Sequence, residues 1–352
     1  MIRVLVVEDS VTVRRRLIDV LAADPELEVV GEAHDGQQAI DRCRDLRPDV
    51  VTMDMMLPVM TGLAATEYIM AHFPTPILIV SSSTNRGELF RTYEALAAGA
   101  VDVLEKPGFD GAEGVWETHF LATIKLVARI RVITHLRGRV GARAAKPLVA
   151  PARVGSRTCA VAAIGASTGG PGAIVEVLRQ LPLDFSLPVL LVLHIGEAFG
   201  RSFAEWLQAQ VGRPVAYAVE GDSLRAASGR VLMAPPNRHL VVRAGVARLT
   251  DDRERHSCRP SVDVLFESLA NDLGPATAAC LLTGMGRDGA MGLRDIRGAG
   301  GITIAQDEAT SVVWGMPREA VLLDAAEHVL PLSEIGTFLA CLSNGPGRAR
   351  PS

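Results

Sequence analysis

A glycine-flanked serine is the residue of this chain best placed to do covalent chemistry. Ser167 lies in the run Ile-Gly-Ala-Ser-Thr-Gly-Gly at 164–170, after an apolar segment at 159–164 that is typical of a buried strand. Pro171 then suits the first turn of a helix. The glycines allow a tight strand-to-helix turn that leaves the Ser167 hydroxyl uncrowded. Such a turn predicts either a nucleophile or a phosphate-binding loop, and by itself it does not choose between them.

A serine nucleophile needs a base that accepts its proton and a carboxylate that orients the base. His194 follows directly on the apolar run 188–193, and Asp288 lies in a glycine-rich loop after the apolar run 278–282. The carboxyl ends of parallel strands meet at one edge of a sheet, so these two side chains are expected to converge on Ser167. The chain order Ser, His, acid differs from the Ser, acid, His order of α/β-hydrolases.

A second group of residues, near the beginning of the chain, indicates phosphoryl chemistry. Each of them follows an apolar run: Glu8 and Asp9 the first, Asp54 the third, Ser81 the fourth and Lys106 the fifth. Three carboxylates at one sheet edge repel one another unless a cation lies among them, and Mg²⁺ prefers oxygen ligands. The lysine and the hydroxyl could then hold the oxygens of a phosphoryl group on the central carboxylate.

Two α/β units are expected to position these groups. Residues 1–136 alternate apolar runs with amphipathic segments, which predicts a five-stranded doubly wound parallel sheet covered by helices. Its strands are expected at 4–7, 28–30, 50–53, 77–80 and 100–104, and a long closing helix at 116–136. The second unit is predicted as a doubly wound, mainly parallel α/β fold with a β-hairpin around 244–245. Its strands are expected at 159–164, 188–193, 215–219, 230–233, 240–242, 278–282 and 302–305, and its helices at 172–181, 201–210, 261–272, 289–297 and 317–324.

The expected boundaries follow from composition. The first unit is placed at 1–125, the end of the closing helix and a linker at 126–157, the second unit at 158–343 and a flexible tail at 344–352. Residues 137–157 carry six basic side chains and no acidic one. The rest of the chain after this linker carries 17 basic and 20 acidic side chains, which does not favour a nucleic-acid-binding unit.

The overall composition is typical of a globular protein without a membrane-spanning segment. Of the 352 residues 48% are apolar and 22% charged, and no apolar run is long enough to cross a bilayer. The chain begins at Met1 without the pattern of a cleaved leader, so a cytoplasmic location without membrane insertion is expected.

The chain has five cysteines, and three of them are expected to be structural. Their spacing fits neither a disulfide framework nor a zinc motif. Cys159, Cys280 and Cys341 lie in apolar stretches, where a free cysteine is usually a small buried hydrophobic residue.

The first unit resembles the receiver domain of two-component response regulators. The residues that carry the resemblance are Glu8-Asp9, Asp54 with Pro58 and Gly62, Ser81, and Lys106-Pro107. The resemblance implies that Asp54 accepts a phosphoryl group from a histidine kinase and that Ser81 and Lys106 contact that group. It also implies a Mg²⁺ site made by Glu8, Asp9, Asp54 and the Met56 backbone carbonyl. Val103 stands where many receivers carry an aromatic switch residue.

The second unit resembles the chemotaxis protein-glutamate methylesterase family. Besides the Ser, His and Asp, the resemblance rests on the stretches 259–266 (Arg-Pro-Ser-Val-Asp-Val-Leu-Phe), 305–311 and 315–320. It implies that Ser167 is the nucleophile, His194 the base and Asp288 the orienting acid, with Thr168 and the Met285 backbone beside the oxyanion. The implied reaction releases methanol from glutamate γ-methyl esters on the cytoplasmic domains of chemoreceptors. Deamidation of receptor glutamines is a second implied activity, and neither reaction needs a cofactor.

One loop departs from this family. Residues 195–200 read Ile-Gly-Glu-Ala-Phe-Gly, where the family typically has a methionine, two prolines and a threonine. The change adds the carboxylate of Glu197 to a loop that shapes the substrate groove. An alternative is therefore a response regulator whose second half is a non-catalytic partner-binding module, or one that acts on a receptor outside chemotaxis. Nucleotide binding at the turn ranks last, because the turn lacks a P-loop lysine.

A receiver joined to a hydrolase suggests a regulated enzyme. The hypothesis is that the unphosphorylated receiver covers the active-site edge and that phosphorylation of Asp54 shifts the population towards accessible Ser167.

Overall fold

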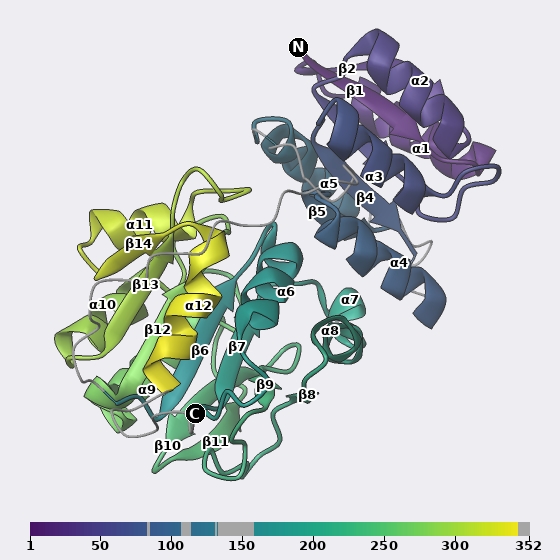
Figure 1. Ribbon diagram of the computed structural model, residues 1–352. Helices are drawn as coiled ribbons and strands as arrows, with labels where there is room; N and C mark the ends of the chain where they lie inside the picture. Colours follow the sequence, from purple (N-terminus) through teal and green to yellow (C-terminus); the bar gives the residue numbers. More distant parts are fainter. Residues whose placement is uncertain (83–84, 107–113, 131, 133–157, 344–352) are drawn as a thin grey trace. The chain divides into compact units, whose positions relative to one another are not determined.

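The computed structural model describes residues 1–82, 85–106, 114–130, 132 and 158–343 (Figure 1). Contacts divide the chain into two compact units, Met1–Ala144 and Ala145–Ser352. This division falls inside the predicted linker 126–157, most of which lies outside the described residues, as does the predicted tail 344–352. No helix among the described residues combines the length and the apolar character needed to cross a bilayer.

The first unit is a parallel five-stranded sheet with the strand order β2-β1-β3-β4-β5, as predicted. Every predicted strand is present, and the strand bounds differ from the prediction by a few residues at most. The elements in chain order are β1 (Ile2–Val7), α1 (Val11–Ala22), β2 (Leu27–Ala33), α2 (Gly36–Leu46), β3 (Val50–Met53), α3 (Gly62–His72), β4 (Ile77–Ser81), α4 (Arg86–Ala97), β5 (Asp102–Glu105) and α5 (Val115–Val127).

Both faces of this sheet are buried because side chains alternate along each strand. Leu5 and Val7 of β1 belong to one apolar cluster, which also contains residues of α2, α3 and α4. Val4 and Val6 belong to a second cluster, with residues of α1 and α5.

The closing helix is shorter than predicted. It was expected to run from 116 to 136, but α5 ends at Val127, with Ala128 as its C-cap. The amides of the next two residues bond back three residues, which tightens the turn and ends the helix. Ile130 and Val132 pack against the core although they are not helical, which explains why the apolar pattern continued beyond the helix end.

The second unit contains a parallel seven-stranded sheet with the order β14-β13-β12-β6-β7-β9-β8 and a separate antiparallel hairpin, β10–β11. The predicted fold class is confirmed. Its elements in chain order are β6 (Val161–Ala166), α6 (Gly170–Gln180), β7 (Val189–Leu193), α7 (Glu197–Gly200), α8 (Phe203–Val211), β8 (Val215–Tyr217), β9 (Val231–Met233), β10 (His239–Arg243), β11 (Val246–Thr250), α9 (Val262–Asp272), a short 3-10 helix (Gly274–Ala276), β12 (Thr277–Leu281), α10 (Ala290–Gly298), β13 (Ile302–Gln306), α11 (Met316–Leu322), β14 (His328–Leu330) and α12 (Leu332–Ser343).

Helices cover the seven-stranded sheet in two groups. Val161 and Ala163 of β6 share one apolar cluster with residues of α9, α10 and α11. Helix α6 packs against α12 and α8, and Figure 1 shows α6 and α12 side by side in front of the sheet. The central strands β12, β6 and β7 are therefore buried, and their carboxyl ends lie at one edge.

Four elements of this unit were not predicted from the sequence: the one-turn helix α7, the short 3-10 helix, strand β14 and helix α12. Strand β14 has only three residues, and Val329 at its centre is exposed, so it has no strong hydrophobic pattern. Helix α12 does carry a readable signal, because Leu332, Ile335, Leu339 and Leu342 repeat at helical spacing and are buried.

Candidate active site

Ser167 and His194 follow two neighbouring strands at the point where each ends. Strands β6 and β7 are parallel, with Ala166 opposite Leu193. The amide of His194 also donates to the Ala166 carbonyl at 3.0 Å. The register therefore makes the serine and the histidine neighbours at the carboxyl edge of the sheet.

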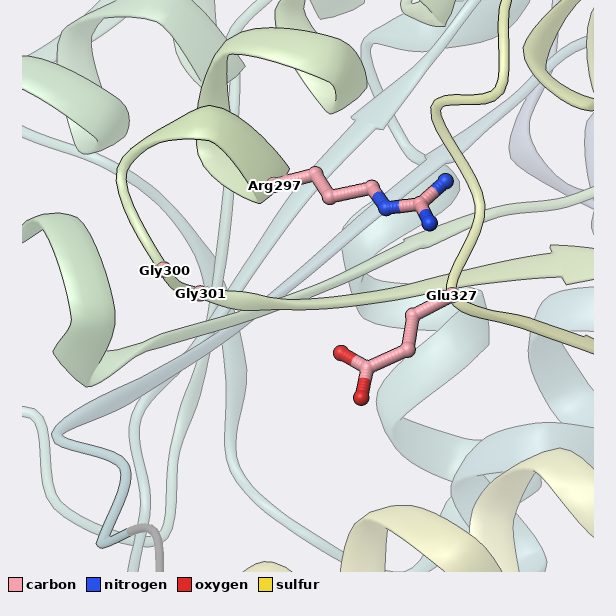
Figure 2. Close-up of a pocket in the computed structure, with 4 residues that line it drawn as sticks. All are labelled: Arg297, Gly300, Gly301 and Glu327. Atoms are coloured by element: carbon pink, nitrogen blue, oxygen red, sulfur yellow. The ribbon is translucent and has the colours of Figure 1, made fainter.

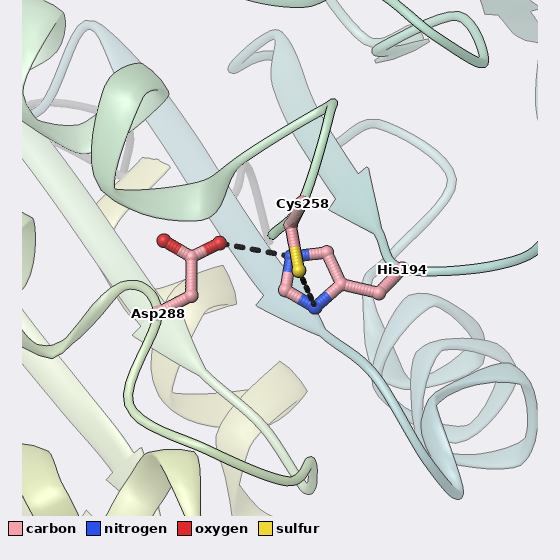
Figure 3. Close-up of side chains that lie close together, drawn as sticks. All are labelled: His194, Cys258 and Asp288. Atoms are coloured by element: carbon pink, nitrogen blue, oxygen red, sulfur yellow. Dashed lines mark hydrogen bonds and ion pairs between the residues drawn. The ribbon is translucent and has the colours of Figure 1, made fainter. Parts of the chain in front are cut away.

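Asp288 reaches the same edge from the other side of β6. Strand β12 pairs with β6, with Leu281 opposite Gly165. In the loop that follows β12, the Asp288 Oδ2 accepts a hydrogen bond from the Nε2 of His194 at 2.9 Å (Figure 3). The convergence of three strand ends predicted from the sequence is thus what the fold contains.

The Asp288 carboxylate is held by the N-terminus of helix α9. Its Oδ1 accepts from Ser261 Oγ at 2.7 Å and from the Asp263 amide at 3.0 Å, and its Oδ2 accepts from the Val262 amide at 2.7 Å. Burial by itself would raise the pKa of Asp288, but the hydrogen bonds and charge of His194, with those of Ser261 and Asp263, lower it below its usual value. The carboxylate therefore stays ionised and fixed in orientation.

The two ring nitrogens of His194 differ: Nε2 is hydrogen-bonded to Asp288, and Nδ1 can accept a proton. Because a carboxylate only accepts, neutral His194 carries its proton on Nε2, and Nδ1 keeps the lone pair. Burial opposes the charged form, but the interactions with Asp288 and Cys258 outweigh it and raise the pKa of His194 to about 9. The Nδ1 lies 3.7 Å from the Sγ of Cys258 (Figure 3), and among the described residues it makes no hydrogen bond with Ser167.

The turn around Ser167 is closely packed. The Ser167 amide donates to the Thr283 carbonyl at 3.0 Å, so it is not available to an oxyanion. A Cβ at Gly284 would lie 2.8 Å from the Ser167 Cβ, so this loop approaches the serine only because residue 284 lacks a side chain. Within the described part of the chain, the amides of Thr168 and Met285 have no hydrogen-bond partner.

The residues that hold Asp288 were not predicted as part of the site. Ser261 and Asp263 were noted only as part of a family motif, although a serine before an apolar helical run is a recognisable N-cap signal. Cys258 was given no role in the site from the sequence, but its Sγ lies 3.7 Å from His194 Nδ1. The expectation for Cys341 was wrong, because it is exposed on helix α12. Its position in the apolar sequence of that helix falls on the face directed to solvent.

The first unit gathers its predicted groups at the carboxyl edge of its own sheet. Lys106 Nζ lies 2.9 Å from Glu8 Oε2 and 3.0 Å from Asp54 Oδ2. Oxygens of Glu8, Asp9 and Asp54 all lie within 4.8 Å of one another. Burial is the main cause that raises the pKa of Asp54, and burial together with the Asp54 charge raises the pKa of Glu8 to about 7.

This acidic cluster fits a divalent cation. The Oδ1 of Asp54 is buried and has no hydrogen-bond partner among the described residues. A carboxylate oxygen left without a partner beside two further carboxylates is suited to a hard cation such as Mg²⁺. The Met56 backbone N–H lowers the pKa of Asp54, which indicates that the Met56 backbone lies near the same site.

Among the described residues the Ser81 hydroxyl bonds neither Asp54 nor Lys106, although the Lys106 amide donates to the Ser81 carbonyl at 3.0 Å. Its hydroxyl donates to the Oε1 of the buried Glu88 at 2.8 Å, and Ser82 bonds the same carboxylate. Contact of Ser81 with a phosphoryl group stays a prediction. Val103, at the position of the usual aromatic switch residue, is partly buried against the core.

A cavity of about 500 Å³ in the second unit lies away from the edge that carries Ser167. Figure 2 shows its lining residues, Arg297, Gly300, Gly301 and Glu327. They come before strands β13 and β14 begin, so the cavity lies at the amino edge of the sheet, opposite the edge that carries Ser167. We do not associate it with the chemistry of the triad.

Both units of the chain match known protein families. The family model described as CheB methylesterase matches residues 162–339, and that of the response regulator receiver domain matches residues 4–113. A protein-glutamate methylesterase/protein-glutamine glutaminase of Anaeromyxobacter dehalogenans is 48% identical over 334 residues, covering 95% of each chain.

The chain belongs to the CheB methylesterase family. A relative of the same name from Pseudomonas aeruginosa is 45% identical over 344 residues, covering 96% of each chain. The crystal structure of the Thermotoga maritima CheB methylesterase catalytic domain is 32% identical, with a TM-score of 0.50, and covers 53% of this chain and 99% of that one. Membership of this family favours the interpretation of the chain as an enzyme over the two alternatives, a non-catalytic binding module and a nucleotide-binding protein.

In this member of the CheB methylesterase family the divergent loop 195–200 contains the one-turn helix α7. Glu197 pairs with Arg201 at 3.0 Å and accepts from Asn237 Nδ2 at 3.1 Å. Its carboxylate therefore takes part in an exposed polar network. The loop is anchored by the Tyr217 hydroxyl, which donates to the Gly200 carbonyl.

Ser261→Ala tests how the Asp288 carboxylate is held. The change removes the hydrogen bond to Asp288 and the side-chain cap on the Val264 amide, so we expect a loss of about 1–2 kcal/mol in the free energy of unfolding of the second unit. Urea unfolding followed by the fluorescence of buried Trp206 measures it.

The matched control is Ser202→Ala. Ser202 occupies the N-cap of α8 but makes no side-chain cap bond, so its loss should stay below about 0.5 kcal/mol. Equal losses in the two variants would contradict this account of Asp288.

Proposed function

We propose that this chain is a phosphorylation-activated protein-glutamate methylesterase. It hydrolyses glutamate γ-methyl esters and releases methanol. The observation that carries the proposal is the hydrogen bond between His194 and Asp288 at 2.9 Å, on strand ends that flank the Ser167 turn.

The proposed mechanism assigns one role to each residue. Ser167 Oγ attacks the ester carbonyl while His194 Nδ1 takes its proton, and the imidazolium then donates that proton to the departing methanol oxygen. Water, deprotonated by the same nitrogen, hydrolyses the acyl-enzyme and restores the serine. In the neutral ring, the hydrogen bond from Nε2 to Asp288 leaves the lone pair on Nδ1, and after proton transfer Asp288 stabilises the imidazolium.

The oxyanion of each tetrahedral intermediate needs hydrogen-bond donors. The Ser167 amide is already bonded to Thr283, so we assign this role to the Thr168 and Met285 amides. Each such donor contributes on the order of 3 kcal/mol to the transition state in serine hydrolases.

The substrates follow from the chemistry of the related enzymes. Relatives are named as both methylesterase and glutaminase, and attack on a glutamine side chain by the same serine releases ammonia. We propose the cytoplasmic domains of chemoreceptors as the carriers of both groups. Neither reaction requires a metal or an organic cofactor in the proposed mechanism.

The receiver site is proposed to control this activity. Asp54 is the phosphoacceptor and a histidine kinase the donor, while Lys106 and Ser81 contact the phosphoryl oxygens. Mg²⁺, held by Glu8, Asp9, Asp54 and the Met56 carbonyl, would neutralise charge on the incoming phosphoryl group.

Ser167→Ala should abolish methanol release from methylated receptor. Without the nucleophile we expect kcat to fall by about 10⁴-fold or more. Methanol released from receptor methylated at its glutamates measures the effect. Ser333→Ala, an exposed serine on α12, is the control and should keep full activity. Equal release by the Ser167→Ala variant and the wild type would exclude the proposed nucleophile.

The pH profile should report His194. The base must be neutral to accept a proton, so kcat/KM should rise with pH until His194 is deprotonated, with a midpoint nearer 9 than the ordinary value of 6.5. Cys258 contributes to the raised pKa, so Cys258→Ser should move the midpoint to lower pH. A wild-type midpoint near 6.5, or the same midpoint in both proteins, would contradict this assignment.

Asp54→Asn should remove activation. With Mg²⁺ and a small acyl phosphate as donor, we expect the methylesterase activity of wild type to rise and the ratio of activated to basal rate to become one in the variant. The Ser167→Ala variant should still take up phosphate while releasing no methanol, which separates the two sites. An undiminished ratio in Asp54→Asn would argue against Asp54 as the acceptor.

A further inference from the structure

The thiol of Cys258 faces the nitrogen of His194 on which catalysis depends. Its Sγ lies 3.7 Å from Nδ1, while Asp288 occupies Nε2 (Figure 3). A ring nitrogen, the sulfur and an Asp288 oxygen all lie within 4.8 Å of one another. We propose that His194 and Cys258 form an inhibitory site for Zn²⁺ or a similar thiophilic divalent cation, with Asp288 supporting the histidine.

The distance between the two donor atoms suits such an ion. With Zn–N near 2.0–2.1 Å and Zn–S near 2.3 Å, a tetrahedral angle places the nitrogen and sulfur about 3.6 Å apart. The observed separation of 3.7 Å is close to this value.

The loop that carries the thiol is held in place before any ion binds. The amide of Cys258 donates to the Arg255 carbonyl at 2.9 Å, and the Arg255 amide donates back to the Cys258 carbonyl at 3.1 Å. The two residues between them, His256 and Ser257, both have positive φ, at 52° and 59°. This tight turn holds the Cys258 backbone, and the Sγ also contacts the His256 carbonyl at 3.4 Å.

Asp288 completes the site without binding the ion. Its oxygens already accept from Ser261, Val262 and Asp263 as well as His194. A histidine that binds a metal through one nitrogen typically donates its other N–H to a carboxylate, which orients the ring and strengthens the ligand. The same carboxylate that supports catalysis would thus support the metal.

The metal chemistry distinguishes this site from the receiver cluster. A thiolate and an imidazole are ligands of zinc, whereas Mg²⁺ takes oxygen ligands. On binding, Cys258 loses its thiol proton to solvent and His194 must be neutral. Two protein ligands leave the remaining positions to water, so the ion is exchangeable.

Inhibition follows from competition for one lone pair. A cation on Nδ1 prevents that nitrogen from taking the Ser167 proton. This consequence rests on the proposed function, but binding of the metal does not.

Cobalt(II) titration of the full-length chain tests the binding. With Mg²⁺ in excess to occupy the receiver, Co²⁺ should bind with one thiolate ligand, seen as a sulfur-to-cobalt charge-transfer band that Zn²⁺ abolishes. Cys258→Ser should lose the band, and Cys341→Ser, which removes an exposed cysteine elsewhere in the same unit, should keep it. A band retained in Cys258→Ser, or absent from wild type, would overturn the proposal.

Methanol release in metal-buffered Zn²⁺ tests the consequence. We expect a chelator to reverse the inhibition of wild type. With each rate expressed relative to that protein's metal-free rate, the half-inhibiting Zn²⁺ concentration should be about tenfold or more higher for Cys258→Ser than for wild type. Equal zinc sensitivity of the two proteins would refute inhibition through this site. A cobalt–thiolate band in a protein without esterase activity would instead support the metal site and refute the proposed function.

Discussion

The ionised carboxylate of Asp288, buried at the N-terminus of helix α9, is the constraint on which the proposed catalytic edge depends. A buried carboxylate is costly unless several donors satisfy it, and here Ser261, two backbone amides and His194 do so. Because those donors come from β7 and α9, one side chain ties together elements that are far apart in sequence. The hydrogen bond between His194 and Asp288 also sets which nitrogen of His194 keeps its lone pair. One contact therefore both stabilises the fold at this edge and sets the protonation of the histidine.

The two sites of the chain compensate the negative charge of their carboxylates in opposite ways. At Asp288 the protein supplies enough donors to keep the carboxylate ionised. In the receiver, the carboxylates of Glu8 and Asp54 share one lysine, Lys106, and burial raises the pKa of both carboxyl groups. The first arrangement is complete without a ligand and supports a preorganised active site. The second leaves an oxygen without a partner, which suits a site that acquires a cation and a phosphoryl group.

Much of the fold was predictable because both sheets are parallel and buried. Their strands are short continuous apolar runs, and the run 50–53 was predicted with its observed bounds as β3. Helix ends were harder: Ile130 and Val132 continue the apolar pattern beyond α5 because they pack on the core outside the helix. Strand β14 is too exposed to produce a hydrophobic pattern in the sequence. It is a strand because it pairs with β13 at the edge of the sheet.

The sequence by itself determined which reactive groups follow which strands. In a parallel sheet, a turn residue that follows a strand lies at the carboxyl edge, whatever the rest of the fold is. Ser167, His194 and Asp288 were found in this way. Only the tertiary structure decided how the groups face one another. The packing of α9 against β6 sets the partners of Asp288, and the turn before Arg259 sets the sulfur of Cys258 beside the histidine. These contacts join segments dozens of residues apart, and no local pattern of residue types encodes their distances.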